Sequence, residues 1–266
     1  MSSLVKWFVT FPYMQYGLGF LQEFMVKVLR TGPIPRHVAF IMDGNRRFAK
    51  YNHLELKEGH VAGFDSLIHI LEFCNQLGIE AVTIYAFSIE NFNRPQHEVD
   101  ALMGMLRSKI VFITDEDSFA KRSNIKIRVL GDRSLIPDDI LEAVMRGEEA
   151  TKDNTGMLLN ICFPYTARDD ITHAIREVSK KVEANELSLD DINLDTFQNE
   201  MYTGKSPPLD ILVRTSGATR LSDFMLWESN MNCRVEFVES LWPDFTIWDM
   251  YRICIKWSYE RTKELA

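Results

Sequence analysis

The sequence predicts an α/β protein: a single domain with a mostly parallel six-stranded sheet flanked by helices, preceded by an N-terminal amphipathic helix. Two observations support this fold class. Six short apolar runs, rich in β-branched and aromatic residues, alternate with longer segments whose apolar residues recur at helical spacing. Most of the short runs are almost continuously apolar, which is typical of strands covered by helices on both faces.

The predicted strands lie at residues 37–42, 81–87, 125–130, 158–163, 211–214 and 235–238. Helical periodicity is clearest at residues 60–77, 98–119 and 169–184. The first of these helices ends at Gly78, because glycine commonly terminates helices. No internal repeat, low-complexity segment or linker interrupts the alternation. Residues 31–266 are therefore predicted to form one domain after an N-terminal segment at residues 1–30.

The N-terminal segment is rich in Trp, Phe, Tyr, Met and Leu, but Pro12, Gln15, Gln22 and Glu23 interrupt it. A membrane-spanning helix needs about 20 predominantly apolar residues. A secretory signal would end in a small-residue cleavage site, which this run lacks. Two interpretations remain open: an amphipathic helix that lies in a membrane interface, or a helix packed on the chain's own core or on a partner.

The composition of the whole chain argues against some functional classes. The formal net charge is −8 and no long basic run is present, so nucleic acid is not a predicted partner. The four cysteines are far apart and form no CxxC pair. This spacing argues against a zinc site or a disulfide framework and fits a reducing compartment, with the cysteines as small buried apolar residues.

Polar residues gather directly after three of the predicted strands, at residues 43–47, 88–94 and 214–217. In open α/β sheets, ligands bind at the carboxyl ends of the strands. We therefore expect one site that draws on all three clusters.

Arginine dominates these clusters and their surroundings. The arginines are Arg46, Arg47, Arg94, Arg214 and Arg220, and Ser88, Ser216 and Ser222 add hydroxyl donors. The planar guanidinium group suits phosphate oxygens. Several such groups in an acidic protein indicate a multiply charged anion as the ligand.

Asp43 is a carboxylate among these arginines, and its role stays open on chemistry alone. It is either a salt-bridge partner or a metal ligand, since Mg²⁺ is commonly held by one or two carboxylates plus substrate phosphates. Gly44 allows the backbone to come close to a ligand. The chain has neither a GxxxxGK[ST] nor a GxGxxG sequence, so a P-loop or a dinucleotide site has no support.

Four segments, at residues 37–50, 86–94, 214–227 and 241–245, resemble motifs of the cis-prenyltransferase family, the relatives of undecaprenyl diphosphate synthase. They occur in the family's order across residues 35–245. The pair Arg46-Arg47, and Ser216-Gly217 after Arg214, are most similar to eukaryotic dehydrodolichyl diphosphate synthase catalytic subunits, particularly the fungal ones.

The resemblance implies an activity. The enzyme would condense isopentenyl diphosphate units onto farnesyl diphosphate or a similar allylic diphosphate, with Mg²⁺ as cofactor. The product would be a long-chain polyprenyl (dehydrodolichyl) diphosphate for dolichol synthesis and protein glycosylation. Residues 31–266 would then be the catalytic domain.

The resemblance also implies roles for single residues. Asp43 would hold Mg²⁺ against the allylic diphosphate. The groups that would cradle or place that diphosphate are Gly44, Asn45, Arg46, Arg47, Arg94 and His60. Ser88 and Asn91 would sit beside the reacting carbons and assist proton removal, and Phe92 would pack on the isoprenoid. Isopentenyl diphosphate would be held by Arg214, Arg220 and Ser222. Without the resemblance, His60 is better explained as a helix-start residue.

The sequence departs from the bacterial pattern at two places. Bacterial relatives have an arginine where this chain has Leu56, and we expect Lys57 to be at most a partial substitute. They also have a second metal-site glutamate after the tryptophan of the third motif. Here that region reads Cys233-Arg234-Val235-Glu236, and the matching position is not acidic. The second metal ligand is therefore unassigned.

A third departure concerns the C-terminus. Single-subunit members end in an Arg-X-Gly motif that closes the neighbouring subunit's site, but no glycine follows Gly217. The resemblance implies a Nogo-B-receptor-like accessory subunit that supplies this motif; a shortened C-terminus is the competing explanation. We expect peripheral association with the cytosolic face of the endoplasmic reticulum membrane, or with lipid droplets.

Other features have simpler explanations. Asp138-Asp139 and Asp190-Asp191 fit helix starts rather than a metal-binding DDxxD motif. Met103, Met105 and Leu106 would line a product tunnel or belong to the ordinary core. Two rival functions are a non-catalytic subunit, which would lose the aspartate and arginines retained here, and a phosphatase, which would need a nucleophile or a second metal cluster.

Overall fold

The computed structural model describes residues 12–114 and 119–265, and side chains at 19–112 and 119–264. Its centre is one six-stranded sheet in the order β3-β4-β2-β1-β5-β6, with every neighbouring pair parallel. The strands are β1 (His37–Ile41), β2 (Ala81–Tyr85), β3 (Lys126–Leu130), β4 (Leu158–Cys162), β5 (Ile211–Arg214) and β6 (Arg234–Phe237). The predicted fold class is confirmed, and each predicted strand is present within one or two residues of its expected ends.

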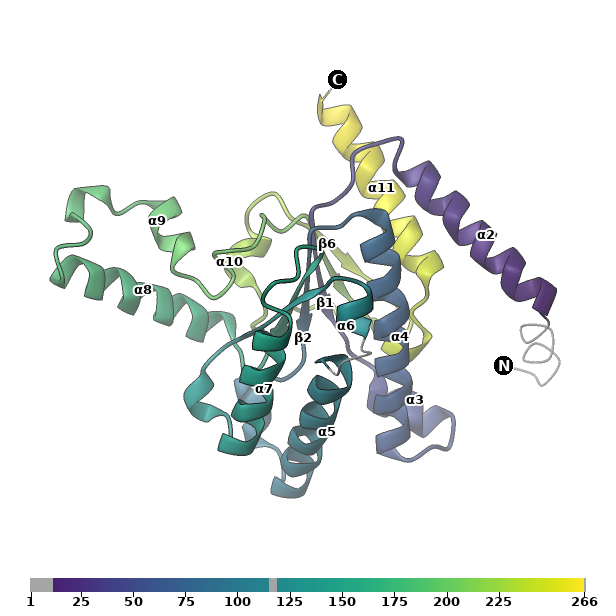
Figure 1. Ribbon diagram of the computed structural model, residues 1–266, viewed down its shortest axis with the longest axis horizontal. Coiled ribbons are helices and arrows are strands. Elements are labelled where there is room, and N and C mark those ends of the chain that lie inside the picture. The colour runs from purple at the N-terminus through teal and green to yellow at the C-terminus, as the bar shows by residue number, and fades with distance from the viewer. Residues whose placement is uncertain (1–11, 115–118, 266) are drawn as a thin grey trace.

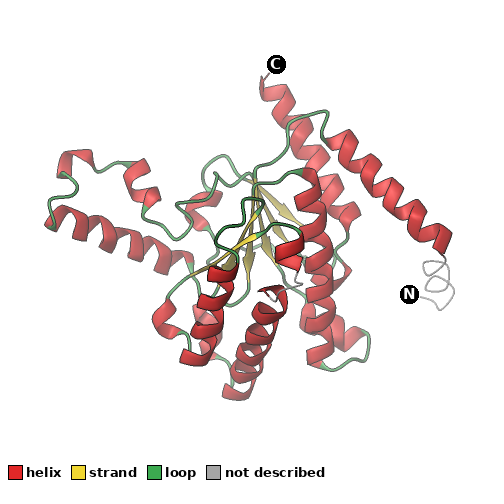
Figure 2. Ribbon diagram, in the orientation of Figure 1, coloured by secondary structure: helices red, strands yellow, loops and turns green. Residues whose placement is uncertain are grey.

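Helices cover both faces of the sheet (Figures 1 and 2). They are α2 (Pro12–Leu29), α3 (Asn45–Tyr51), α4 (Leu56–Leu77), α5 (Gln96–Thr114), α6 (Phe119–Arg122), α7 (Asp138–Ala150), α8 (Ala167–Glu183), α9 (Leu194–Asn199), α10 (Leu226–Ser229) and α11 (Ile247–Leu265). Short 3₁₀ turns are η1 (Ile89–Asn93), η2 (Arg133–Leu135), η3 (Leu189–Asp191) and η4 (Trp242–Asp244). In Figure 1, α8 and α9 project from the sheet as an arm.

The apolar runs of the strands are buried because both faces of the sheet are covered. Every residue of β1 is buried. Phe40 faces a large core formed with α2, α4, α5, α7 and α11, whereas Ala39 faces a smaller core that contains Tyr165 and Phe224. The edge strand β6 is only partly buried.

The strand order places a topological switch point at β1. The chain goes from β1 to β2 on one side and later returns to β5 on the other. At such a point the loops that follow adjacent strands diverge and leave a crevice at the carboxyl edge, where ligands bind.

The contacts of α2 are consistent in part with both predictions for the N-terminal segment: a helix packed on the core and a helix with an exposed apolar face. Met25, Val26 and Leu29 are buried in the core, and α2 contacts α4 and α11. Phe20 and Phe24 on the same helix are 72% and 56% exposed. No helix among the described residues is both long and apolar enough to cross a membrane. The first 11 residues of the N-terminal segment lie outside the described residues.

Candidate active site

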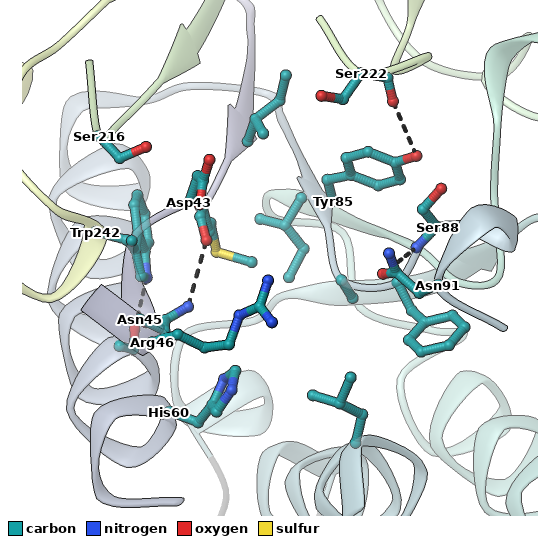
Figure 3. Close-up of a pocket in the computed structure, with 18 of the residues that line it drawn as sticks. Asp43, Asn45, Arg46, His60, Tyr85, Ser88, Asn91, Ser216, Ser222 and Trp242 are labelled. Carbon is teal, nitrogen blue, oxygen red and sulfur yellow. Dashed lines mark hydrogen bonds between the residues drawn. The ribbon is translucent and has the colours of Figure 1, made fainter. Parts of the chain in front are cut away.

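A cavity of about 1190 Å³ opens at the carboxyl ends of β1, β2 and β5. One part of its lining is polar and charged, and the rest is formed by apolar side chains of α4, α5 and the sheet. Figure 3 shows Asp43, Asn45, Arg46 and His60 on one side of the cavity, opposite Tyr85, Ser88, Asn91 and Ser222. The three polar clusters of the sequence therefore meet in one site, as predicted.

Asp43 follows β1 and contacts two arginines from different parts of the chain. Arg214 Nη2 donates a hydrogen bond to Asp43 Oδ2 at 2.9 Å, and Arg47 Nη2 lies 3.6 Å from Oδ1. Partial burial opposes ionisation, but the hydrogen bond and charge of Arg214, together with Arg47, outweigh it and lower the pKa of the Asp43 carboxyl. The side chain is a carboxylate at neutral pH and remains 34% exposed to the cavity.

Arg214 is the buried centre of the second cluster, with a side chain that is only 3% exposed. Its Nη1 atom donates to Ser222 Oγ at 2.7 Å and to the carbonyl of Arg220 at 2.6 Å. The guanidinium group therefore fixes the loop that carries Arg220 and Ser222, and both of these residues line the cavity.

Two buried donors at this end of the cavity have no hydrogen-bond partner among the described residues: Arg214 Nε and Ser216 Oγ. Arg47 Nη1 donates to the carbonyl of Ser216 at 3.1 Å, and the Ser216 side chain also helps to lower the pKa of the Asp43 carboxyl. Unpaired buried donors are costly. Arg214 and Ser216 both line the cavity, so their spare donors agree with the predicted anionic ligand.

The turn between β1 and α3 has no space for a side chain at Gly44. Gly44 has a φ of 118°, and a Cβ at this position would lie 3.0 Å from Leu241. Asn45 packs against Gly63 of α4, where a Cβ would meet the Asn45 Oδ1 atom at 2.1 Å. Trp242 Nε1 donates to the carbonyl of Gly63 at 2.7 Å. These contacts hold the turn against α4 at the cavity wall.

His60, Arg46 and Arg94 form the next part of the wall. Partial burial and then the charges of Arg46 and Arg94 lower the pKa of His60. The imidazole is therefore mostly neutral at pH 7 in the absence of a charged ligand, and its one N–H group can donate a hydrogen bond to a ligand oxygen. Burial also lowers the pKa of Arg94, with Arg46 as the next cause. Arg46 itself lies 3.8 Å from Glu98.

Ser88 and Asn91 face the cavity from the turn after β2. Ser88 N–H donates to Asn91 Oδ1 at 3.1 Å (Figure 3), and Ser88 Oγ accepts from the Glu90 N–H at 3.2 Å. The hydrogen bond to Oδ1 therefore fixes the orientation of the Asn91 side-chain amide within the turn. Phe92, in contrast, is not among the lining residues. It packs edge-on against Phe87, which does line the cavity, with ring centroids 5.0 Å apart.

The remaining cavity wall is apolar. The side chains that form it are Phe64 and Leu67 of α4, Leu102, Met105, Leu106 and Ile110 of α5, and Ile84, Ile161 and Phe163 of the sheet. Met105 and Leu106 therefore fulfil the predicted lining role, whereas Met103 is buried in the core instead. The wall is suited to a branched hydrocarbon chain.

Sequence reasoning missed some lining residues. Tyr85 looked like an ordinary strand residue, but its hydroxyl lies 3.3 Å from the Ser222 carbonyl. Lys109 looked like a solvent-exposed helix residue, but its ammonium group lies 3.9 Å from the centroid of the Phe64 ring inside the apolar wall. Glu90 and Asp223 also line the cavity. The sequence signal that could have found Glu90 and Asp223 is their position, two residues after Ser88 and one residue after Ser222.

The departures from the bacterial pattern do not bring new groups into the cavity. Leu56 and Lys57 are exposed at the start of α4 and do not line the cavity. Cys233 precedes β6, at the amino edge of the sheet, and Glu236 binds Arg234 and Lys256. Asp139 lies in the first turn of α7, as expected for a helix start. Its Oδ2 atom is 3.4 Å from Nη1 of Arg107 in α5. All four cysteines are free, and all except Cys233 are buried.

The possible metal ligands of the site are few. Within the described ranges, no cluster of three or more His, Cys, Asp or Glu side chains is arranged to hold a metal ion. Asp43 is the lining carboxylate that contacts Arg47 and Arg214, whereas Glu90 and Asp223 are paired with Arg168. A metal bound there would need oxygen ligands from a substrate or water as well.

Comparisons with known proteins identify the family of this chain. Residues 41–264 match the family described as putative undecaprenyl diphosphate synthase. The chain is 39% identical over 260 residues to a dehydrodolichyl diphosphate synthase complex subunit of Schizosaccharomyces pombe, covering 98% of both chains. It is 43% identical over 239 residues to the corresponding Homo sapiens subunit, covering 90% of this chain and 72% of the human one.

Solved structures show the same fold. Lavandulyl diphosphate synthase from Lavandula x intermedia, in complex with dimethylallyl diphosphate, superposes with a TM-score of 0.78 at 33% identity. The match covers 85% of this chain and 95% of that one. A probable undecaprenyl diphosphate synthase from Campylobacter jejuni gives a TM-score of 0.68 at 27% identity, with the same coverage. The chain therefore belongs to the undecaprenyl diphosphate synthase family and is a cis-prenyltransferase.

Proposed function

We propose that this enzyme condenses isopentenyl diphosphate units onto farnesyl diphosphate, or a similar allylic diphosphate, to make long-chain dehydrodolichyl diphosphate for dolichol synthesis and protein glycosylation. The names of the relatives from fission yeast and human support this product class. The cavity supports it too, since one arginine-rich end and a long apolar wall match a molecule with a diphosphate head and a hydrocarbon tail.

The observation that carries the proposal is the arrangement around Asp43. Its carboxylate lies between Arg214 and Arg47, and Arg214 and Ser216, which carry unpaired donors, line the same cavity. Two diphosphates bound there would be held in a fixed mutual orientation, which lowers the entropic cost of bringing them together. Preformed positive charge also stabilises the pyrophosphate as it leaves.

We assign the allylic diphosphate to the Asp43 side, with Gly44, Asn45, Arg46, Arg47, Arg94 and His60, and isopentenyl diphosphate to Arg214, Arg220 and Ser222. With this placement, Ser88 and Asn91 lie across the cavity beside the reacting carbons. The His60 imidazole lines the cavity beside Arg46 and Arg94 and contributes a hydrogen bond to the diphosphate. Phe92 acts indirectly, by supporting the ring of Phe87 that faces the isoprenoid.

The residues at this end fit Mg²⁺. This ion keeps several waters and is usually held by one or two carboxylates plus substrate phosphates, so the single Asp43 carboxylate is a sufficient protein ligand. When bound, the ion would neutralise charge on the pyrophosphate leaving group. The arginines position the diphosphate, and Asp43 orients it relative to them.

A second subunit belongs to the proposal. The yeast and human relatives are named as subunits of a complex. We infer that this enzyme also works with an accessory subunit, of the Nogo-B-receptor type, that contributes an Arg-X-Gly motif to the site. We further propose peripheral association with the cytosolic face of the endoplasmic reticulum membrane or with lipid droplets, since the product is a very long hydrocarbon and α2 exposes Phe20 and Phe24.

The test is incorporation of radiolabelled isopentenyl diphosphate with farnesyl diphosphate, with and without Mg²⁺ and with and without the accessory subunit. We expect long polyprenyl products that require the subunit and are abolished by EDTA and by Asp43→Ala. Asp100→Ala is the matched control, because Asp100 is an exposed aspartate of α5 away from the cavity. A folded complex without incorporation would refute the proposed reaction, and full activity of the chain alone would refute the need for a second subunit.

A further inference from the structure

One arginine outside the cavity joins the two loops that form its polar end. Arg168 lies in the first turn of α8 and is not among the lining residues. Its Nε atom donates to Asp223 Oδ2 at 2.6 Å, and its Nη2 atom donates to Glu90 Oε1 at 3.0 Å. Its backbone N–H also donates to Asp223 Oδ1 at 3.2 Å. Arg168 therefore binds one carboxylate from the turn after β2 and one from the loop after β5.

The loop after β5 needs such support because its backbone is strained. Ser222, Asp223 and Met225 have φ values of 50°, 59° and 45°, in the left-handed region. Non-glycine residues persist in that region only where their surroundings hold them. The Asp223 side chain is 13% exposed, and its backbone carbonyl accepts from the Ala167 N–H at 2.7 Å. The first turn of α8 is thus the main anchor of Asp223.

The anchor determines where the preceding residue lies. Ser222 is the neighbour of Asp223 and accepts the Arg214 hydrogen bond at its Oγ atom. If the loop relaxed from its left-handed conformation, the Ser222 hydroxyl and the Arg220 side chain would both move relative to Arg214. Arg214, inside the cavity, and the anchor of Asp223, outside it, therefore act together to hold these two groups of the isopentenyl diphosphate site in place.

Charge gives Arg168 a second effect. Glu90 and Asp223 are carboxylates that line a cavity built for anions, where they would repel a diphosphate. Arg168 is paired with both of them. Its single positive charge offsets one of the two carboxylate charges. Because the guanidinium group bonds to a carboxylate on each loop, it also links the Ser88–Asn91 turn to the Arg220–Ser222 loop.

We propose that Arg168 is a positioning residue that couples these two loops and sets the affinity for isopentenyl diphosphate. The inference rests on the proposed assignment of Arg220 and Ser222 to that substrate. Arg168 itself touches neither substrate. Its effect is on ground-state binding, so it should appear in KM rather than in kcat.

The test is steady-state kinetics of the full chain with its accessory subunit, varying each substrate in turn. We expect Arg168→Ala to raise the KM for isopentenyl diphosphate about fivefold, the upper end for an ion pair whose arginine is 70% exposed. The KM for farnesyl diphosphate should stay within about twofold. Arg176→Ala is the matched control: Arg176 is an exposed arginine of the same helix, away from the cavity.

A double-mutant cycle tests the contact itself. If Arg168 acts through Asp223, Asp223→Asn should also raise the KM for isopentenyl diphosphate, and the double variant should be little worse than either single one. Independent, multiplying effects would refute the coupling. A purely structural role predicts a loss in kcat or melting temperature with both KM values unchanged, and that result would also refute the proposal.

Ser222→Ala, measured alongside, separates this inference from the site assignment on which it rests. If Ser222→Ala raises the KM for isopentenyl diphosphate and Arg168→Ala does not, the coupling is wrong and the assignment stands. If neither variant changes that KM, the assignment of the loop to isopentenyl diphosphate is wrong, and the inference falls with it.

Discussion

The carboxylate of Asp43 shares its two oxygens between two guanidinium groups, and this arrangement explains why the residue can be both ionised and exposed to a ligand. Asp43→Asn keeps the shape but removes the charge that would hold a metal ion and orient the arginines. We expect kcat to fall by about 10² to 10³, as for loss of one preorganised electrostatic group. Initial rates at saturating substrates test this. A variant that keeps a tenth of the wild-type rate would contradict the role of the carboxylate.

His37 illustrates a titratable residue with a structural rather than a catalytic role. It is fully buried in β1, its Nδ1–H donates to the Pro207 carbonyl at 2.8 Å, and its Nε2 accepts from the Thr83 hydroxyl at 2.7 Å. Burial, partly offset by the backbone hydrogen bond, lowers the pKa of His37 to about 4. The unfolded chain takes up this proton near the ordinary histidine pKa of about 6.5.

This difference predicts a pH dependence of stability. Between pH 6.5 and about 4, the unfolded state binds a proton that the folded state does not, so the free energy of unfolding falls as the pH falls. From pH 7 to pH 5, His37 should contribute a loss of about 2 kcal/mol. Urea unfolding at both pH values, for the wild type and His37→Gln, measures it. An equal pH dependence in the two proteins would show that His37 is not the group responsible.

At the residue scale, the sequence predicted the site residues whose charge is unusual beside an apolar strand. It missed those whose side chains are ordinary for a strand or a polar helix face. Asp43 and Arg214 stood out as charges directly after apolar strands. Tyr85 and Lys109 fitted a strand and a polar helix face, and only the packing of α5 against α4 shows that Lys109 enters the cavity. The resemblance to the family implied that Phe92 packs on the isoprenoid, but Phe92 is not a lining residue and packs on Phe87, which does line the cavity.

At the element scale, helix ends were predicted less well than helix existence. The predicted helix at 60–77 begins one turn earlier, at Leu56, because Glu55 and Glu58 form a capping box in which the Glu55 N–H donates to Glu58 at 2.8 Å. The periodicity of this segment begins only where its apolar face meets the core. No apolar signal marks the first turn, which is exposed.

The helix α5 sets the size of the apolar part of the cavity, together with α4. Leu106 is one of its lining residues and is only partly buried, so a larger side chain can be accommodated by filling the cavity instead of the core. Leu106→Trp should therefore shorten the product while leaving the first condensations intact. Chromatography of labelled products measures the chain length.

Met145→Trp is the control for this prediction. Met145 is 58% exposed on α7 and does not line the cavity, so the same bulky residue there should leave the product length unchanged. Products of wild-type length from Leu106→Trp, at a comparable rate, would show that the growing chain does not pass this part of α5.

At the scale of the whole molecule, the parallel sheet explains why a site assembled from residues 171 positions apart, such as Asp43 and Arg214, was predictable. Polar residues after parallel strands must meet at one edge, whatever their separation in sequence. The strand order was not predicted, because continuous apolar runs contain no information about which strands are neighbours. Hydrophobic periodicity predicted the helix α8, but it did not predict that α8 and α9 project from the sheet as an arm (Figure 1).

The exposed face of α2 bears on the proposed membrane association. The helix α2 buries Met25, Val26 and Leu29 against the core but leaves Phe20 and Phe24 exposed, an arrangement that suits contact with a membrane interface. Each phenylalanine side chain would contribute about 2 kcal/mol on full burial in an apolar phase. Replacing both with serine should weaken vesicle binding at least about tenfold without disturbing the buried face.

Vesicle co-sedimentation of the complex, with anionic and with neutral phospholipid vesicles, measures this effect. The control is Leu189→Ser with Leu194→Ser, which removes two exposed apolar side chains, 71% and 61% exposed, from the arm at the other end of the fold. If the two double variants weaken binding equally, the association reflects general surface hydrophobicity and not α2. If the α2 variant binds vesicles as the wild type does, its exposed phenylalanines face something other than lipid, and the second subunit becomes the occupant to test next by co-purification.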